Sequence, residues 1–460
     1  MDAIKPSFFV NKKRFYITLF TLTLPIALQN VISFAVNLAD NIMVGTLGEE
    51  ALAGVYAASH VSTLLQMLVL GISAAMILLS AQYVGKNDFT AVKKIISIGL
   101  KFSLISGLVV WMAVFFFPNE VLSLFTDDPV VAQYGKSYIV ILCFSFVFFC
   151  LTNVFISAMR CVKTVILGTV ISVISLMVNV FFNWVFIYGN LSAPVMGVEG
   201  AAIATVIARV VECLIVVIYV FFFDKKLKIK FTELFRGSKI LFYDFIKYGL
   251  PAITGDVFWG VNLAVQGAIV GRLGDSTISA VSIANTVFQI VSVFSYGVKD
   301  AASVMVGVAI GEGNEPKVRQ YSRTLQVIFL GVGVVTGAMM LIIQDPVCMI
   351  YKNSMNQETL DIVRQLLKVL SVTIIGTSYQ MATLKGIVVA GGATNFVLFN
   401  DLIFIPLFVI PSAAIAAFVF HAPAWVVFAC LKSDQVLKCT VAAVKVNCGK
   451  WMRNLTRESV

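Results

Sequence analysis

The sequence predicts an all-α polytopic membrane protein with twelve transmembrane helices in two six-helix lobes, related by a parallel internal repeat. Composition is the first indication, because 59% of the 460 residues are hydrophobic and only 13% are charged, whereas soluble domains carry about 25% charged residues. At about 20 apolar residues per crossing, the chain accommodates on the order of a dozen helices. The pattern of loop charge and a sequence repeat are the other two indications. This composition excludes a soluble enzyme and a nucleic-acid-binding module.

Apolar runs between polar breaks define the twelve candidate spans. They are residues 15–41, 51–82, 93–117, 132–158, 165–188, 200–223, 246–271, 276–310, 322–343, 361–389, 396–420 and 423–444. The second and eighth are long enough to tilt or to protrude from the bilayer. The last is interrupted by polar residues between 432 and 438.

The loop charges test this count through the positive-inside rule. One set of loops holds most of the basic residues: Lys5, Lys12, Lys13 and Arg14; Lys86, Lys93 and Lys94; Arg160 and Lys163; Lys225, Lys226, Lys228, Lys230, Arg236, Lys239 and Lys247; Lys317, Arg319 and Arg323; Lys445, Lys450, Arg453 and Arg457. The opposite loops carry Glu49, Glu50, Asp127 and Asp128 instead. We therefore expect a multi-pass protein of the cell (inner) membrane with both termini cytoplasmic. The net charge of +10 reflects this topology, and no nucleic-acid partner is expected.

The cysteines and histidines give no sign of a disulfide framework or a metal centre. The eight cysteines include no Cys-x-x-Cys pair, and most lie in apolar runs, where a free cysteine behaves as a small hydrophobe. The chain has two histidines, His60 and His421. We expect no histidine-based metal site, no cofactor and no enzymatic activity.

The chain repeats itself at an offset of 226 residues. This offset superimposes Leu24-Pro25 on Leu250-Pro251, Val44-Gly45 on Val270-Gly271, Leu47-Gly48 on Leu273-Gly274 and Gly85 on Gly311. Each copy contains six spans, so both cross the membrane in the same sense, and transporters built this way bind substrate between their halves. The expected division is an N-terminal lobe (1–223), a basic cytoplasmic linker (224–245) and a C-terminal lobe (246–460). A duplication that only enlarges the helix bundle is the alternative.

Charged residues that occur in one copy alone mark where the lobes differ in chemistry. They are Asp40 (Gln266 in the other copy), Asp256 (Asn30), Lys299 (Ser73) and Asp300 (Ala74). A charge at membrane depth costs about 2.5–3.5 kcal/mol or more. Each of these residues is therefore expected to have a partner or a function.

Three stretches resemble the multidrug and toxic compound extrusion (MATE) transporters, of the bacterial type. They are Leu24-Pro25 followed by Ala39-Asp40-Asn41-Ile42-Met43-Val44-Gly45, then Gly200-Ala201-Ala202-Ile203-Ala204-Thr205, and Val306-Gly307 followed by Gly311 and Gly313-Asn314. The resemblance implies secondary active efflux of amphiphilic, often cationic drugs or metabolites in exchange for H+ or Na+. It also implies alternating access between two lobes of a monomer, with no cofactor besides the coupling ion.

Asp40 and Pro25 are the candidate coupling and hinge residues of the first span. A carboxylate near a helix C-terminus meets the negative end of the helix dipole, so Asp40 is a poor cap there. The family carries an Asp at this place, which implies a protonation site or a Na+ site, the single metal site expected. Pro25 removes one backbone hydrogen bond and kinks the helix. The family resemblance makes it a hinge, and a static kink is the alternative.

Asn179 and Asn183 are spaced i, i+4 and share one face of the fifth span, and Thr205 is placed to face them from the sixth. The family pattern has an acid where this chain has Asn183. Two amides and a hydroxyl form hydrogen bonds to a protonated or ion-bound Asp40 but do not titrate. Interhelical adhesion is the equally supported alternative.

The second lobe has a separate set of candidates, for a substrate or second ion site. Asp256, Lys299 and Asp300 fall near the midplane at 1.5 Å per residue, and the alternative is a structural Asp256–Lys299 pair. Trp259 stands where some MATE proteins have a Glu. Tyr379 and Gln380, with Phe258, Trp259 and Phe288, are candidates to line an aromatic cavity for cations, and ordinary packing of the Phe side chains is the alternative. The pairs Arg209–Glu212 and Asp434–Lys438 are expected to be structural.

Two other transporter classes remain as rivals. A major facilitator also has twelve spans in parallel repeats, but its characteristic loop motif does not match the residues that follow Gly85. A flippase for lipid-linked precursors needs a strongly cationic cavity, whereas Lys299 is the one central cation that the spans offer. Efflux by ion exchange is therefore the favoured function.

Overall fold

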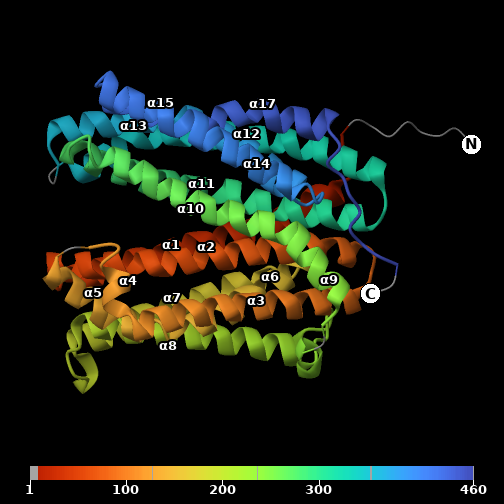
Figure 1. The fold of residues 1–460 in the computed structure, drawn as a ribbon, viewed down its shortest axis with the longest axis horizontal. Helices are drawn as coiled ribbons and strands as arrows, with labels where there is room; N and C mark the ends of the chain where they lie inside the picture. The colour runs from red at the N-terminus through yellow and green to blue at the C-terminus, as the bar shows by residue number, and fades with distance from the viewer. Residues whose placement is uncertain (1–8, 127, 236, 353–354, 459–460) are drawn as a thin grey trace, which may run out of the picture. The chain divides into compact units, whose positions relative to one another are not determined.

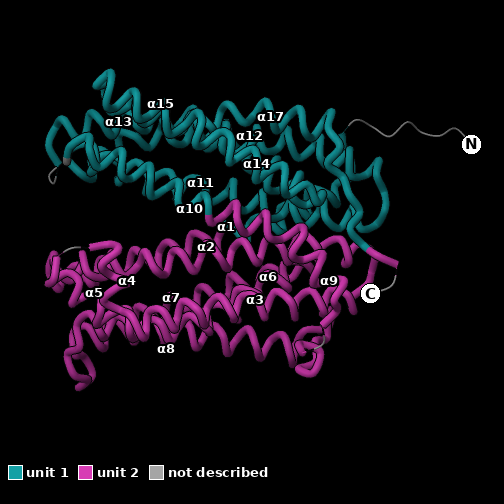
Figure 2. Tube along the Cα trace, viewed as in Figure 1, with its two compact units in different colours: residues 1–27, 258–456 teal, residues 28–257, 457–460 magenta. Residues whose placement is uncertain are grey.

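The structure is a computed structural model that describes residues 9–126, 128–235, 237–352 and 355–458. These residues form helices and connecting turns, with no β-strand among them (Figure 1). Three of the charged loop residues named above, Lys5, Asp127 and Arg236, lie outside the described residues. The chain divides into two compact units, which Figure 2 shows in two colours. Unit 1 is residues 1–27 and 258–456, and unit 2 is residues 28–257 and 457–460.

Unit 2 contains most of the first sequence copy. Helix α1 (Lys13–Gly45) enters it at residue 28, and α10 (Leu250–Val270) leaves it at residue 257. Between them lie α2 (Glu49–Gly85), α3 (Phe89–Phe116), α4 (Pro118–Leu122), α5 (Pro129–Leu142), α6 (Ser145–Cys161), α7 (Ile166–Tyr188), η1 (Asn190–Ser192), α8 (Gly197–Ile218), η2 (Tyr219–Phe223), η3 (Phe231–Phe235), α9 (Lys239–Asp244) and η4 (Phe245–Gly249). The π-helical turn η4 joins α9 to α10, so the helical segment of the seventh span begins at Lys239.

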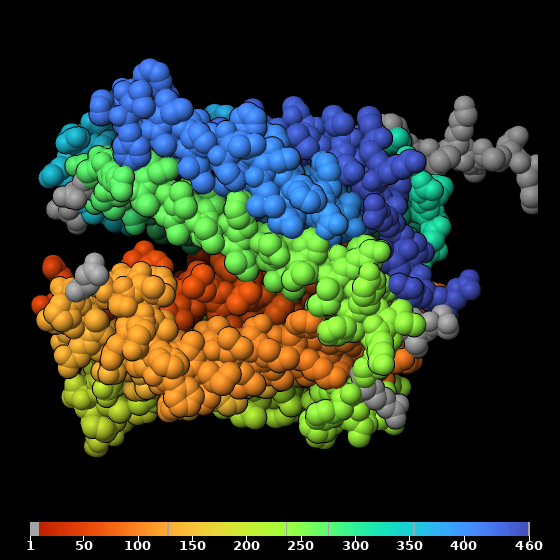
Figure 3. Space-filling model, in the orientation of Figure 1, coloured from red at the N-terminus to blue at the C-terminus, as the bar shows by residue number. Residues whose placement is uncertain are grey.

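Unit 1 contains most of the second copy. Its helices after α10 are α11 (Asp275–Gly311), α12 (Glu315–Tyr351), α13 (Gln357–Met381), η5 (Ala382–Val388), α14 (Thr394–Phe404), η6 (Ile405–Val409), α15 (Ile410–Ala414), η7 (Ile415–Val419), α16 (Ala424–Leu431) and α17 (Asp434–Cys448). In the space-filling view, α14 and α15 form part of the face of this unit that is turned to the reader (Figure 3). Phe399 and Leu407 on this segment are 60% and 64% exposed. Such an apolar outer surface suits contact with lipid.

The 226-residue repeat reappears in the helix boundaries. Helices α2 and α11 begin and end at equivalent positions of the two copies. Helices α3 and α12 also begin at equivalent positions. The turns before α2 and α11 each place a glycine at positive φ, Gly48 at 116° and Gly274 at 96°, where a side chain would be strained. The side chain of Asp88 caps α3 and that of its equivalent, Asn314, caps α12, each accepting a backbone N–H. The parallel internal repeat is thus confirmed at the level of local structure.

The described residues contain nine helices that are long and apolar enough to cross a membrane. Helices α5 and α6 meet the criterion only as a pair, which bends by 54° at its break, so the predicted fourth span is not one straight helix. The predicted spans 361–389 and 423–444 are helical but do not meet the same criterion. Helices α16 and α17 have 8 and 15 residues, because the polar stretch from residue 432 interrupts the last span. Helix α12 runs well beyond both ends of the predicted ninth span.

Each unit has its own apolar core. In unit 2 the core includes Val61 and Leu65 of α2, Ile139 of α5 and Ala202 of α8. Helices α2 and α5 approach closely at Gly54, where an added Cβ would lie 2.6 Å from the Cβ of Tyr134. In unit 1, leucines and valines of α13 pack with residues of α11, α15 and α16. Close packing of this kind holds the polar side chains of neighbouring helices at fixed positions.

Candidate coupling site

The first candidate site lies in unit 2, where three helices bring four predicted residues together. Asp40 belongs to the last part of α1, Asn179 and Asn183 to α7, and Thr205 to α8. The spacing of the two asparagines places both amides on one face of α7, and neither side chain is exposed. Asp40 and Thr205 are half-buried.

A continuous series of hydrogen bonds connects the four side chains. Nδ2 of Asn183 donates to Oδ1 of Asp40 and, at 3.2 Å, to Oδ1 of Asn179. Nδ2 of Asn179 donates to Oγ1 of Thr205 at 3.3 Å. The Thr205 hydroxyl donates to the carbonyl of Ala201 at 3.0 Å, one turn earlier in α8. The contacts expected from the sequence are therefore present, and their role in coupling stays a prediction.

One polar atom of this network has no partner among the described residues. It is Oδ1 of Asn183, which is buried and accepts no hydrogen bond. A buried acceptor without a donor costs about 1–3 kcal/mol. Nδ2 of Asn183 thus donates to two partners, whereas Oδ1 of the same side chain can still accept a hydrogen bond.

Two neighbouring residues extend the electrostatics of the site. Arg209 lies one turn beyond Thr205 on α8 and interacts electrostatically with Asp40. Its Nη1 is 2.9 Å from Oε2 of Glu212, so the predicted Arg209–Glu212 pair is confirmed. Tyr138 of α5 is 7% exposed and interacts with both Thr205 and Asp40. The sequence analysis did not select Tyr138, because one hydroxyl in an apolar span is a weak signal.

Pro25 lies inside α1, which continues as one helix from Lys13 to Gly45. Its position falls just before the boundary of the two units, between residues 27 and 28. The equivalent Pro251 lies at the start of α10, directly after the π-helical turn η4. A π-helical turn changes the hydrogen-bond pattern next to Pro251. Helix α1 has no such turn near Pro25.

The charged candidates of the second lobe are divided between the units. Lys299 and Asp300 are consecutive residues of α11 in unit 1, and Nζ of Lys299 lies 2.8 Å from Oδ1 of Asp300. The same Nζ is 6.0 Å from the centre of the Tyr296 ring. Asp256 is a residue of α10 within unit 2. The Asp256–Lys299 pair stays a prediction.

Tyr379 and Gln380, adjacent residues of α13, contact different helices. The Tyr379 hydroxyl donates to Oε1 of Gln326 on α12 at 2.8 Å, and Nε2 of Gln380 donates to Oε1 of Gln435 on α17 at 2.8 Å. Trp259 is half-buried on α10, and Phe288 of α11 packs against the apolar core of unit 1. The two polar side chains therefore connect helices, and an aromatic cation site stays a prediction.

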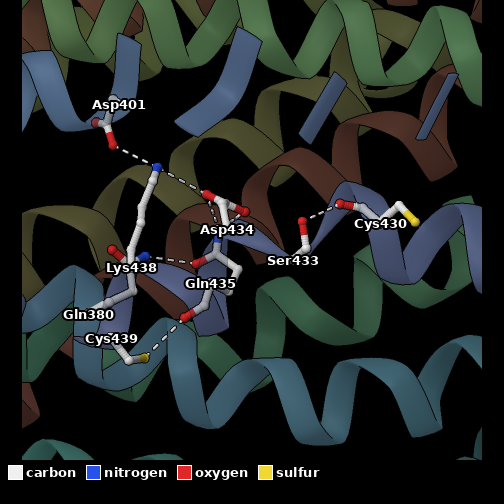
Figure 4. Close-up of polar contacts among 8 residues, drawn as sticks. All are labelled: Gln380, Asp401, Cys430, Ser433, Asp434, Gln435, Lys438 and Cys439. Carbon is white, nitrogen blue, oxygen red and sulfur yellow. Dashed lines mark hydrogen bonds and ion pairs between the residues drawn. The ribbon is translucent and has the colours of Figure 1, made fainter. Parts of the chain in front are cut away.

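A buried charged cluster in unit 1 was only partly anticipated. Lys438 and Asp434 form the predicted pair, with Nζ and Oδ2 at 3.1 Å. Asp401 of α14 joins them, its Oδ1 2.7 Å from the same Nζ (Figure 4). The sequence analysis missed Asp401, although an acid inside the apolar span 396–420 was a sufficient signal.

Comparison with known proteins identifies the family. The sequence model of the MatE family matches residues 25–185 and again residues 256–415, so it covers most of the chain and matches once in each repeat. The chain belongs to the MatE family. This MATE protein is accordingly a transporter and not an enzyme, and its apolar helices make it a multi-pass membrane protein. Membership in this family also excludes the major facilitator alternative.

Relatives and solved structures agree with this assignment. The probable multidrug resistance protein NorM of Agrobacterium fabrum is 24% identical over 318 residues, which are 69% of this chain and 68% of that protein. The multidrug resistance protein NorM of Vibrio vulnificus is 23% identical over 381 residues, 82% of this chain and 81% of that protein. The structure of a MOP superfamily transporter from Pyrococcus furiosus has a TM-score of 0.85 at 19% identity and covers 93% of this chain and 94% of its own. Together with the repeat, this structural match confirms the two-lobe fold of a MATE transporter.

Proposed function

We propose that this MATE transporter exports amphiphilic, often cationic drugs or metabolites in exchange for H+ or Na+ by alternating access. It works as a monomer without a cofactor, with Asp40 as the coupling residue and both termini in the cytoplasm. The relatives' description as multidrug resistance proteins supports the substrate class. The positive-inside distribution of Lys and Arg supports the orientation.

The observation that carries the proposal is the hydrogen bond between Asn183 and Asp40. The amide group donates to the ionised carboxylate and leaves its own Oδ1 without a partner. Rotation of this amide by half a turn exchanges Nδ2 and Oδ1 and breaks the bond from Nδ2 to Oδ1 of Asn179. The Asn183 oxygen then accepts from a protonated Asp40, or it joins the carboxylate in binding Na+. The network thus supports Asp40 in both states that ion exchange requires.

The charge state of Asp40 is proposed to control the shape of α1. Asp40 and Pro25 lie on the same helix, and the missing backbone N–H at Pro25 makes bending there easier. An ionised Asp40 retains its polar partners. A neutral Asp40 releases them, so that α1 bends at Pro25 and expels the substrate from this lobe.

Transport into vesicles with one imposed gradient at a time tests the proposal. Wild-type protein should transport a fluorescent organic cation under either a proton gradient or a sodium gradient. The gradient that drives transport identifies the coupling ion. Asp40→Asn keeps the size of the side chain and one acceptor oxygen but removes its charge. This variant should insert normally and lose gradient-driven transport.

Glu120→Gln is the matched control, because Glu120 is an exposed acid of α4 in the same unit. It should transport like the wild type. Gradient-driven transport by Asp40→Asn at the wild-type rate would refute Asp40 as the coupling residue. A lack of transport by the wild type under both gradients would refute ion-coupled efflux itself.

A further inference from the structure

Asp401, Asp434 and Lys438 form a buried ion cluster in unit 1. The Lys438 ammonium lies between two carboxylate oxygens, 2.7 Å from Oδ1 of Asp401 and 3.1 Å from Oδ2 of Asp434 (Figure 4). The Lys438 side chain is 3% exposed, and those of the carboxylates are 12% and 9% exposed. Two helices, α14 and α17, supply the carboxylates, so the ammonium also joins the helices.

Further polar and charged residues surround the cluster. Lys432 interacts electrostatically with Asp434, so the formal charges of two lysines equal those of two carboxylates. Nε2 of Gln435 lies 3.1 Å from each oxygen of Asp434, and Gln380 donates to Gln435. The ring of Phe404 lies 6.0 Å from the Lys438 ammonium. Without Lys438, the cluster would carry one uncompensated negative charge in a water-poor region, where such a charge is costly.

We infer that Lys438 is a tethered cation which occupies a monovalent-cation site formed by Asp401 and Asp434. Carboxylate oxygens are hard ligands of the kind that hard cations such as Na+ select, and the ammonium occupies the position between them. Since the ammonium already fills the position, the second lobe binds no Na+ at this cluster. Ion exchange is consequently confined to other sites of the transporter. The inference goes beyond the proposed function and does not depend on the role of Asp40.

Removal of the ammonium should convert the cluster into a Na+ site. Lys438→Met keeps much of the side-chain length and leaves a formal net charge of minus one on the cluster. Thermal unfolding of the purified protein is compared in NaCl and in N-methylglucamine chloride at equal concentration. The pH is held at about 8 in both salts. Lys438→Met should gain a Na+-specific rise in Tm of at least about 2 °C over the wild type, since a ligand stabilises the state that it binds.

The double variant Asp401→Asn/Lys438→Met is the matched control, because Asp434 and Lys432 then balance each other. Its Na+ response should equal that of the wild type, so that any Na+ bound elsewhere cancels in the comparison. If Lys438→Met folds only in NaCl, the inference is also supported. An unchanged Na+ response of Lys438→Met overturns it, as does a Lys438→Met protein that fails to fold in both salts while the double variant folds.

Discussion

Asn183 donates a hydrogen bond from its amide nitrogen to Oδ1 of Asp40, a residue 143 positions earlier in the chain. The bond joins α7 to the end of α1 inside unit 2. A hydrogen bond to a charged group contributes about 1.5–3 kcal/mol. If the bond is formed in one conformation of the protein and lost in another, it therefore changes the equilibrium between them by a factor of about ten or more.

Asn183→Leu should slow gradient-driven transport about tenfold or more and leave membrane insertion intact. The leucine fills a similar volume but neither donates to the ionised carboxylate nor accepts from the protonated one. Initial transport rates in vesicles measure the effect. Asn153→Leu is the control, since the Asn153 amide donates within α6 to the Phe149 carbonyl at 2.9 Å. Equal rates for the two variants would remove Asn183 from the coupling network.

Pro25→Ala should slow exchange while substrate binding stays near normal. Alanine restores the backbone N–H and its hydrogen bond, which favours the straight form of α1 by about 1 kcal/mol. Pro251→Ala in α10 should do less harm, because the π-helical turn η4 already relieves that position. Substrate affinity and transport rate are measured separately for both variants. Equal losses of rate, or none from Pro25→Ala, would identify both prolines as static architecture.

Lys299→Ala should reduce the yield of folded protein, because it removes the ammonium that lies 2.8 Å from Oδ1 of Asp300. The loss in free energy of unfolding should be smaller than the ~3–5 kcal/mol that breaking a fully buried pair costs, since the Lys299 and Asp300 side chains are 24% and 23% exposed. Adding Asp300→Ala to this variant should recover part of the yield. Recovery with Asp256→Ala instead would support the pair predicted from the sequence, and recovery with neither would favour a functional role for Lys299.

Cys448 offers a test of orientation in the native sequence. It is the one exposed cysteine, since the other seven, all within the described residues, are buried or partly buried. It ends α17, close to the C-terminus. A membrane-impermeant maleimide should label inside-out vesicles and spare intact cells, and Cys448→Ser should abolish the signal. Labelling of intact cells at Cys448 would place the C-terminus outside.

Asp244→Asn should release the C-terminal segment from unit 2. Nε and Nη2 of Arg457 each lie 2.7 Å from a carboxylate oxygen of Asp244, and Lys86 donates to the Arg457 carbonyl at 2.6 Å. The bidentate hydrogen bond to Asp244 raises the pKa of the Arg457 guanidinium, so the guanidinium is ionised throughout the physiological range.

Limited trypsin digestion, followed by mass spectrometry, measures the release. Cleavage after Arg457 should be faster in Asp244→Asn than in the wild type. Asp361→Asn removes the carboxylate of an exposed pair with Arg364 and should leave cleavage unchanged, because exposed pairs contribute little. Wild-type cleavage rates in Asp244→Asn would show that other contacts hold the segment.

The sequence by itself determined the all-α membrane fold class, the internal repeat and part of the site around Asp40. Hydropathy and loop charge predicted the spans, because lipid demands long apolar helices. The offset of 226 residues aligned Gly48 with Gly274 and Gly85 with Gly311, the glycines that precede and end α2 and α11. The i, i+4 spacing placed Asn179 and Asn183 on one face of α7, and the lone acid of the first copy marked Asp40.

Only the tertiary structure decided which of these residues meet. The sequence did not distinguish Asn183 from Asn179 as the partner of Asp40, nor did it bring Asp401 to Lys438. Such contacts depend on the rotation, depth and bending of each helix against its neighbours. Those quantities follow from the packing of small and large side chains along the whole interface, such as Gly54 against α5. Helical periodicity specifies the face of a residue on its own helix, and close packing determines what that face contacts.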